Sequence, residues 1–316
     1  MCTAVSYRTK DHYFGRNLDL EMSYGERVII TPRKYEFRFL YEGTVSEHYA
    51  IIGMGIVKND YPLYFDATNE AGLSIAGLNF PDNAIYYPNK QGFVNIASYE
   101  LIPWILSKCK NIFEVKEALN NINITEDSFS KELLTSPLHW MISDSDESIV
   151  VESVKEGLKV YDNPVKVLTN NPPFDYQMFN LNNYMNLSIN SMVNNFSGEL
   201  KLDNYSRGMG GIGMPGDLSS MSRFVRAAFT RMNSVCEACE SESVSQFFHI
   251  LGSVEQQRGL VYLGDGNYEI TRYSSCCNAN RGIYYYTTYE NRNITSVDMH
   301  KENLDSEKII KFPAII

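Results

Sequence analysis

The beginning of the chain constrains the fold most strongly, because two runs rich in β-branched and aromatic residues lie there on either side of a short polar break. The runs cover residues 2–7 and 13–19, and the break contains Lys10 and Asp11. This pattern predicts two adjacent strands that form a hairpin. Such a hairpin sets Cys2 beside Arg16 and Asp19.

Cys2 becomes chemically distinctive once the initiator Met is removed, which is common when a small residue follows it. The residue then carries both a thiol and a free α-amino group. A free thiol has a reference pKa of about 8.5 and an α-amine one of about 7.7 to 8.0, so the amine can accept the thiol proton near neutral pH. Arg16 would favour the thiolate, and Asp19 would orient the amine. The alternative is that Cys2 merely follows the start codon and that Arg16 and Asp19 form a surface pair.

Composition limits the classes of function. The chain has 316 residues, 44% of them apolar, which is enough for one large domain or two smaller ones. Its net charge of −10 argues against nucleic-acid or anionic-membrane partners, which favour basic surfaces. No stretch approaches the roughly 20 apolar residues of a membrane span, and six cysteines are too few for a disulfide framework. We therefore expect a cytoplasmic protein.

The order of the expected elements favours one domain, residues 1–316, with two packed antiparallel sheets and helices outside. Periodicity predicts strands at residues 26–31, 35–41, 48–57, 63–67, 73–78, 136–144, 148–154, 158–161, 165–169, 268–275, 282–289 and 295–299. It predicts helices at residues 95–109, 113–120 and 244–255, and another that begins near Ser219.

Several motifs resemble the choloylglycine hydrolase family, and in particular its bile salt hydrolases. They are the opening Met1-Cys2-Thr3-Ala4, the run at residues 13–19 and the stretch at residues 29–33. The resemblance covers nearly the whole chain. It implies an N-terminal-nucleophile hydrolase with a four-layer αββα sandwich, in which Cys2 attacks an amide and no metal or organic cofactor takes part. It also implies a homotetramer that cleaves conjugated bile salts into a bile acid and glycine or taurine.

The same resemblance gives roles to three further residues. Asn79 matches a position that is typically Asn in bile salt hydrolases and Tyr in penicillin V acylases, and its amide would stabilise an oxyanion. Asn170, within Thr169-Asn170-Asn171-Pro172, matches a second catalytic Asn. Arg223, near the start of the helix that follows Ser219, would bring a positive charge to the nucleophile. Without the resemblance, the two Asn residues are ordinary turn residues and Arg223 is an exposed side chain.

A steroid requires an apolar pocket with few polar groups. The family resemblance suggests six wall residues, each of which could instead belong to the core: Leu18, Tyr24, Phe65, Phe129, Leu133 and Leu138. Two other functions remain open at this stage. One is penicillin V acylase, which uses the same nucleophile, and the other is a non-catalytic bile-acid or lipid-binding protein with the same fold.

Two other features of the sequence receive a structural interpretation. His139 could serve as the base of a Cys–His pair, but no supporting motif accompanies it, so a structural histidine is favoured. Residues 208–213 formally match the dinucleotide-binding fingerprint, yet neither a buried strand before them nor a helix after them is predicted. We expect a close-packed glycine loop there.

Overall fold

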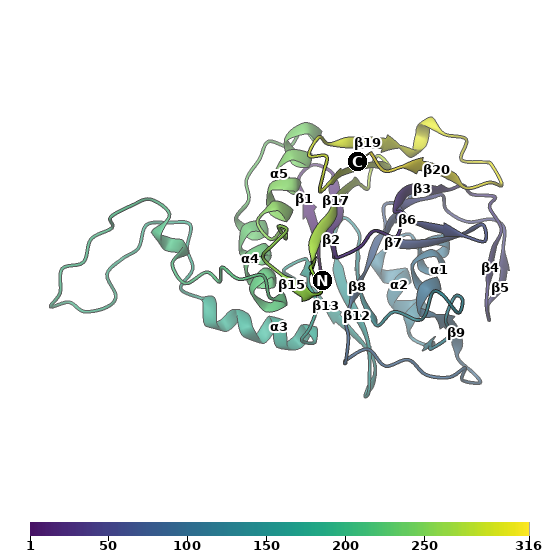
Figure 1. Cartoon of the computed structure of the whole chain (residues 1–316), viewed down its shortest axis with the longest axis horizontal. Helices are drawn as coiled ribbons and strands as arrows, with labels where there is room; N and C mark the ends of the chain where they lie inside the picture. The colour runs from purple at the N-terminus through teal and green to yellow at the C-terminus, as the bar shows by residue number, and fades with distance from the viewer. Residues whose placement is uncertain (316) are drawn as a thin grey trace.

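Two large antiparallel sheets lie face to face, and helices cover the outer face of each (Figure 1). The computed structural model describes residues 1–315. The first sheet has six strands in the order β14-β1-β2-β17-β18-β19. They are β14 (Val167–Leu168), β1 (Cys2–Arg8), β2 (His12–Leu20), β17 (Ile270–Asn278), β18 (Ile283–Thr288) and β19 (Thr295–Asp298).

The second sheet has eight strands in the order β13-β12-β11-β8-β7-β6-β3-β20. They are β13 (Gly157–Asp162), β12 (Ser148–Val154), β11 (Leu138–Ser143), β8 (Ser74–Asn79), β7 (Tyr61–Asn69), β6 (Ile51–Lys58), β3 (Arg27–Thr31) and β20 (Ile310–Pro313). Three two-stranded sheets complete the strands: β4 (Phe37–Phe39) with β5 (Gly43–Val45), β9 (Val94–Ala97) with β10 (Ile122–Thr125), and β15 (Tyr262–Gly264) with β16 (Asn267–Tyr268).

The helices are amphipathic, and each of the four that cover a sheet buries one apolar face. The α-helices are α1 (Leu101–Lys108), α2 (Ile112–Leu119), α3 (Phe174–Asn180), α4 (Ser220–Asn233) and α5 (Glu240–Gly252). Helices α4 and α5 pack on β1, β2 and β17, whereas α1 packs on β6, β7 and β8. Phe224 of α4 and Phe247 of α5 are fully buried on one side of the molecule, and Ile105 of α1 and Val115 of α2 on the other. Each such side chain contributes on the order of 2 kcal/mol.

These layers confirm the αββα sandwich that the sequence predicts. The inner faces of the two sheets share one core, in which Leu18 of the first sheet is buried together with Ile30, Met54 and Leu78 of the second. The first hairpin is also confirmed, because β1 and β2 pair in the register Cys2↔Leu18 and Ala4↔Arg16.

Two helical predictions need correction, and one helix was not predicted. The predicted helix at residues 95–109 begins only at Leu101, since residues 94–97 form β9 and pair in parallel with β10. Pro103 then lies in the first helical turn, where its missing N–H breaks no hydrogen bond. The helix predicted from residue 244 begins at Glu240, and α3 directly after Pro173 is not predicted at all.

The glycine loop at residues 208–213 is close-packed only at Gly210, and the expectation of a close-packed loop is wrong for the rest, because Gly208 and Gly211 face open space. Gly208 has a φ of 79°, which disfavours any residue with a Cβ. A Cβ at Gly210 would overlap the carbonyl oxygens of Ser188 and Asn190. Across residues 1–315, none of the helices has the length and apolar character that crossing a bilayer requires.

His12 makes the stability of this fold depend on pH. Burial lowers the pKa of His12 to about 4, whereas an unfolded His titrates near about 6.5. The unfolded chain therefore binds the extra proton first as the pH falls, so stability is lost between about pH 6.5 and 4, by roughly 3 kcal/mol. His12→Gln, which can keep a hydrogen bond to Ser6, should flatten this decline. Urea unfolding at several pH values measures it, and parallel curves for the two proteins would contradict the assignment.

Candidate active site

The hairpin of β1 and β2 places the Cys2 thiol and the Arg16 guanidinium on the same face of the first sheet. Cys2 lies opposite Leu18 and Arg16 lies opposite Ala4, and directly opposed residues share a face. Arg16 Nη1 donates hydrogen bonds to the carbonyl oxygens of Phe65 (3.0 Å) and Gly77 (2.5 Å), which belong to the second sheet. Both side chains thus lie between the sheets, where Cys2 is 3% exposed and Arg16 is 1% exposed.

Arg16 stays charged in this buried position because acidic groups surround it. Burial alone would lower the pKa of Arg16, but Cys2, Tyr273 and Asp66 raise it above its usual range. Asp66 in turn accepts hydrogen bonds from the hydroxyl groups of Tyr273 (2.6 Å), Tyr284 (2.6 Å) and Ser275 (3.2 Å). The sequence analysis missed Asp66, although a lone carboxylate inside the apolar run at residues 63–67 is a recognisable signal.

Asn170 lies at the backbone of Cys2. Strand β14 pairs with β1 and ends at Leu168, two residues before Asn170. The Cys2 nitrogen donates to Asn170 Oδ1 (2.7 Å), and Arg223 Nη2 donates to the same oxygen (2.8 Å). Asn170 Nδ2 donates to the carbonyl oxygen of Asn79 (2.7 Å). Since an amide nitrogen carries two hydrogens, one N–H of Asn170 remains for another acceptor.

Arg223 is fully buried at the start of α4 and binds the other side of the same backbone. Its Nη1 donates to the carbonyl oxygen of Cys2 (2.5 Å) and to Thr3 Oγ1 (2.7 Å), and its Nε donates to the carbonyl oxygen of Leu218 (3.0 Å). Nη1 also lies 3.8 Å from Asp19 Oδ2. The guanidinium therefore fixes the first two residues of β1 and places a positive charge beside them.

Asp19 lies at the amino terminus, as the hairpin predicts. Its backbone nitrogen donates to the carbonyl oxygen of Met1 (2.9 Å), and its carbonyl oxygen accepts from the Met1 ammonium (2.7 Å). The ammonium also forms an ion pair with Glu269. Burial raises the pKa of Asp19, whereas Arg223 and the terminal ammonium oppose that shift. With Met1 present, the nitrogen of Cys2 is an amide and the free amine belongs to Met1.

Asn79 is the last residue of β8, and its side chain is exposed at the edge of this cluster. The structure thus brings together Cys2, Arg16, Asp19, Asn170 and Arg223 and places the backbone of Asn79 against them. It holds two guanidinium groups, a carboxylate and the Asn170 carboxamide close to the residue that carries the thiol, which is an arrangement that can attack a carbonyl carbon and stabilise the negative oxygen that results.

Comparisons with known proteins agree with this geometry. Residues 2–312 match the model of the linear amide C–N hydrolases, choloylglycine hydrolase family. The chain belongs to this family. It is 57% identical to the bile salt hydrolase/transferase of Lactiplantibacillus plantarum over 99% of this chain and 97% of that one. It is 41% identical to the bile salt hydrolase/transferase of Clostridium perfringens, with 98% and 95% coverage.

Two solved structures have the same architecture. A mutant conjugated bile acid hydrolase from Clostridium perfringens superposes with a TM-score of 0.92 at 39% identity, covering 100% of this chain and 97% of that one. Penicillin V acylase from Agrobacterium tumefaciens has a TM-score of 0.75 at 21% identity, with 99% and 91% coverage. The second likeness concerns the fold alone.

Three of the six predicted wall residues lie near the nucleophile. Leu18 pairs with Cys2 across the hairpin, and the carbonyl of Phe65 binds Arg16. The ring of Tyr24, which is exposed, lies 6.2 Å from that of Phe65. This exposed aromatic residue beside a half-buried one is a suitable edge for an apolar pocket.

The other three wall candidates lie at residues 129–138, before and at the start of β11. Phe129 packs its ring against Tyr61 (5.8 Å between centroids) and Tyr99 (5.3 Å). Leu138 pairs with Asn79 in the second sheet and packs on the core beneath α1, and Leu133 is half-buried in the preceding loop. Their contact with a substrate stays a prediction.

Proposed function

We propose that this protein is a bile salt hydrolase that cleaves the amide between a bile acid and glycine or taurine, with Cys2 as the nucleophile. One observation carries the proposal: Cys2 lies among Arg16, Asp19, Asn170 and Arg223 in a chain that is 57% identical to a bile salt hydrolase/transferase over almost its full length. The partners of Cys2 come from both sheets and from α4, so we propose that residues 1–316 act as one domain.

Removal of Met1 completes the nucleophile. The nitrogen of Cys2, 2.7 Å from Asn170 Oδ1, then becomes an α-amine in a buried site between two guanidinium groups. Burial already lowers the pKa of the Met1 amine; Cys2 and Asp19 oppose that shift, and Arg223 and Arg16 add to it. The same surroundings favour a neutral Cys2 amine, which can take the thiol proton.

The reaction then proceeds through a thioester. Cys2 Sγ bonds to the amide carbon, and the free N–H of Asn170 together with the amide of Asn79 binds the oxyanion. The C–N bond breaks as the Cys2 ammonium returns its proton to the leaving glycine or taurine nitrogen. Water hydrolyses the thioester, and an amine in place of water would give the transfer reaction that the names of the relatives include. The chain's own groups supply every proton and charge, so the mechanism needs no metal or organic cofactor.

Turnover of three substrates by one purified sample tests the proposal. Glycocholate and taurocholate should release free glycine and taurine, and penicillin V should be a poor substrate. Intact-protein mass should show that Met1 is absent from the active fraction. Binding of bile salt without release of the amino acid would instead favour a non-catalytic binding protein, and faster cleavage of penicillin V would favour an acylase.

We also propose that the protein is a homotetramer in the cytoplasm. Its six cysteines are all free, which fits a reducing compartment. The segment after α3 extends far from the two sheets (Figure 1). Hydrogen bonds between Met192 and Asn204 (2.8 and 3.1 Å) hold its two limbs together. Met185 is 82% exposed, and Phe196 and Tyr205 are each 83% exposed.

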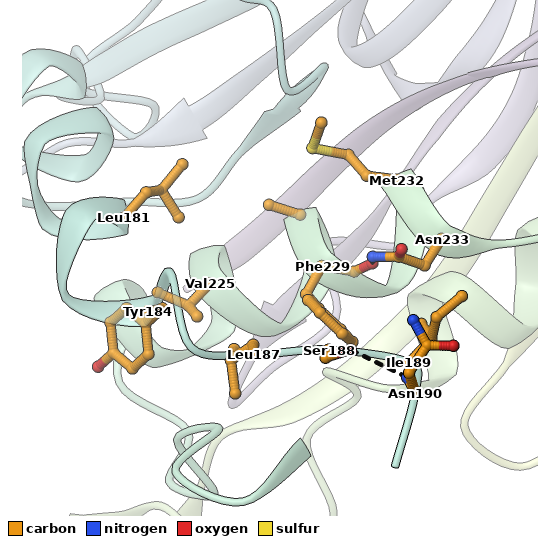
Figure 2. A pocket seen from close by; sticks show the side chains of 11 residues that line it. Leu181, Tyr184, Leu187, Ser188, Ile189, Asn190, Val225, Phe229, Met232 and Asn233 are labelled. Atoms are coloured by element: carbon orange, nitrogen blue, oxygen red, sulfur yellow. Dashed lines mark hydrogen bonds between the residues drawn. The ribbon is translucent and has the colours of Figure 1, made fainter. Parts of the chain in front are cut away.

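We call residues 185–208 of this extended segment the arm. An apolar groove lies at the base of the arm. It has a volume of about 570 Å³ between Leu181, Tyr184 and Leu187 on one side and Val225 and Phe229 of α4 on the other (Figure 2). None of the predicted site residues lines it. Exposed apolar side chains gathered beside an apolar groove are typical of a protein–protein contact, and we propose that a second copy of the chain covers the arm and groove.

Charged residues on the arm should therefore dissociate the oligomer. The double variant Val193→Glu, Phe196→Glu places two carboxylates where another subunit would cover them, so light scattering should report a smaller assembly than the wild-type tetramer. Phe113→Glu, at a 72% exposed Phe on α2, is the matched control and should leave the mass unchanged. An arm variant that stays tetrameric would place the interface elsewhere.

A further inference from the structure

A buried histidine and glutamate lie beside the proposed active site and have no part in the mechanism above. His139 of β11 and Glu152 of β12 are both 0% exposed. His139 Nδ1 lies 2.9 Å from Glu152 Oε1, and His139 Nε2 lies 2.9 Å from the carbonyl oxygen of Thr169. The backbone nitrogen of Phe174, at the start of α3, donates to the same Glu152 oxygen (3.1 Å).

These contacts fix the hydrogens of the ring. A carbonyl oxygen only accepts, so Nε2 must carry a hydrogen that it donates to Thr169. The short contact between Nδ1 and Glu152 also requires a hydrogen, which comes either from the imidazolium or from the carboxylic acid. The ring is therefore held at both nitrogens, and neither its position nor its orientation is free.

His139 connects the two segments that carry the proposed oxyanion donors. Its ring stacks on Phe80, the residue after Asn79, with centroids 4.2 Å apart and planes 6° apart. Its Nε2 binds the carbonyl of Thr169, the residue before Asn170. The hydrogen bond from Asn170 Nδ2 to the Asn79 carbonyl (2.7 Å) joins the same two segments directly.

We propose that His139 is a positioning residue, which sets the distance between the Asn79 and Asn170 carboxamides and thereby shapes the oxyanion hole. The inference rests on the proposed function. Oxyanion donors act only when they lie at hydrogen-bond distance from the position of the developing charge, and small displacements cost large factors in rate. His139 touches neither substrate nor thiol, so it acts through the two Asn residues.

Two amide substitutions separate this role from a merely structural one. In His139→Gln, the longer side chain can place its amide nitrogen near the former Nε2 and keep the bond to Thr169, while Glu152 loses its side-chain partner and keeps only the Phe174 N–H. In His139→Asn, the amide nitrogen falls near the former Nδ1, which keeps Glu152 paired and loses Thr169. Both variants lose the imidazole ring that stacks on Phe80, so that loss cancels in the comparison.

The proposal predicts opposite rankings for stability and turnover. The Asn variant should be the more resistant to urea, because Glu152 stays paired. The Gln variant should have the higher kcat on glycocholate, by about 10-fold or more, with KM values within about 3-fold of each other. If kcat follows stability, with Asn above Gln, His139 only supports the fold and the proposal is wrong.

Alkylation of Cys2 by iodoacetamide gives the second measurement, followed by the mass of the N-terminal peptide. The reagent needs the thiolate but no oxyanion hole, so its rate should be the same in both variants and in the wild type. A loss of alkylation parallel to the loss of kcat would mean that His139 acts on the nucleophile, which also overturns the proposal.

A matched control distinguishes failure of this inference from failure of the proposed function. His12→Gln replaces another fully buried histidine that binds Ser6 (3.0 Å), a residue of β1 beyond the nucleophile. It should keep kcat within about 2-fold of the wild type. A wild-type protein that releases no glycine or taurine would reject the proposed function itself. An active wild type with no kcat difference between the two His139 variants would reject only the role of His139.

Discussion

Replacement of Cys2 by Ala is expected to reduce the release of glycine from glycocholate by about 10⁴-fold or more, because no other group can form the thioester. The thiol is 3% exposed between the two sheets, and Ala fits the same space, so the fold should persist. The Cys2→Ala variant should bind glycocholate in calorimetry with nearly the wild-type affinity. Near-normal turnover by this variant would rule out Cys2 as the nucleophile.

Retention of Met1 should have an effect of similar size by a different route. The thiol is then unchanged, but the nitrogen of Cys2 is an amide that cannot accept a proton, and the free amine is bound to Asp19 and Glu269 instead. Activity should therefore follow the fraction of molecules that lack Met1 in the intact mass spectrum. A fully active sample in which every molecule keeps Met1 would remove the α-amine from the mechanism.

The proximity of Cys2 and Arg16 could be predicted from sequence because it depends on a local hairpin, where alternation and a short turn fix the register. On its other side β2 pairs with β17, and this pairing could not be predicted, since β17 comes from residues 270–278, far along the chain. That long-range pairing brings Thr271 to Asp19, at 2.6 Å between Oγ1 and Oδ1. Local periodicity carries no information about it.

Asn170 and Arg223 were found by resemblance alone, because turn propensity and helix periodicity give no reason to separate them from similar residues nearby. Their orientation lay beyond the sequence altogether. Asn170 directs Oδ1 at the Cys2 nitrogen and Nδ2 at the Asn79 carbonyl. This orientation depends on Arg223, which donates a hydrogen bond to Asn170 Oδ1. Only the packing of α4 on β1 determines this arrangement.

Replacement of Arg223 by Gln is expected to reduce both turnover and stability. The guanidinium donates to the Cys2 carbonyl, Thr3 and Asn170, so its loss frees the segment that carries the nucleophile. We expect kcat to fall by about 10³-fold. The change also removes the guanidinium from beside the buried Asp19 carboxylate, and breaking a buried ion pair typically costs about 3–5 kcal/mol of unfolding free energy.

A second substitution separates the two effects. The double variant Asp19→Asn, Arg223→Gln removes the buried charge that lost its partner, so it should regain much of the stability in urea. Its kcat should stay well below that of the Asp19→Asn single variant, because the donors to Cys2 and Asn170 are still missing. Recovery of kcat together with stability would mean that Arg223 serves the fold alone.

Two further variants test whether position and shape matter in addition to charge. Arg223→Lys keeps a positive charge, but a single ammonium cannot reproduce a planar guanidinium that binds on several sides, so kcat should lie well below the wild type. Arg226→Gln, one turn further along α4, removes bonds to the carbonyls of Pro215, Asp217 and Ser253 and no bond to Cys2 or Asn170. Its kcat should remain within a few-fold of the wild type. Equal losses in the Arg223 and Arg226 variants would show that α4 contributes only general stability to the site.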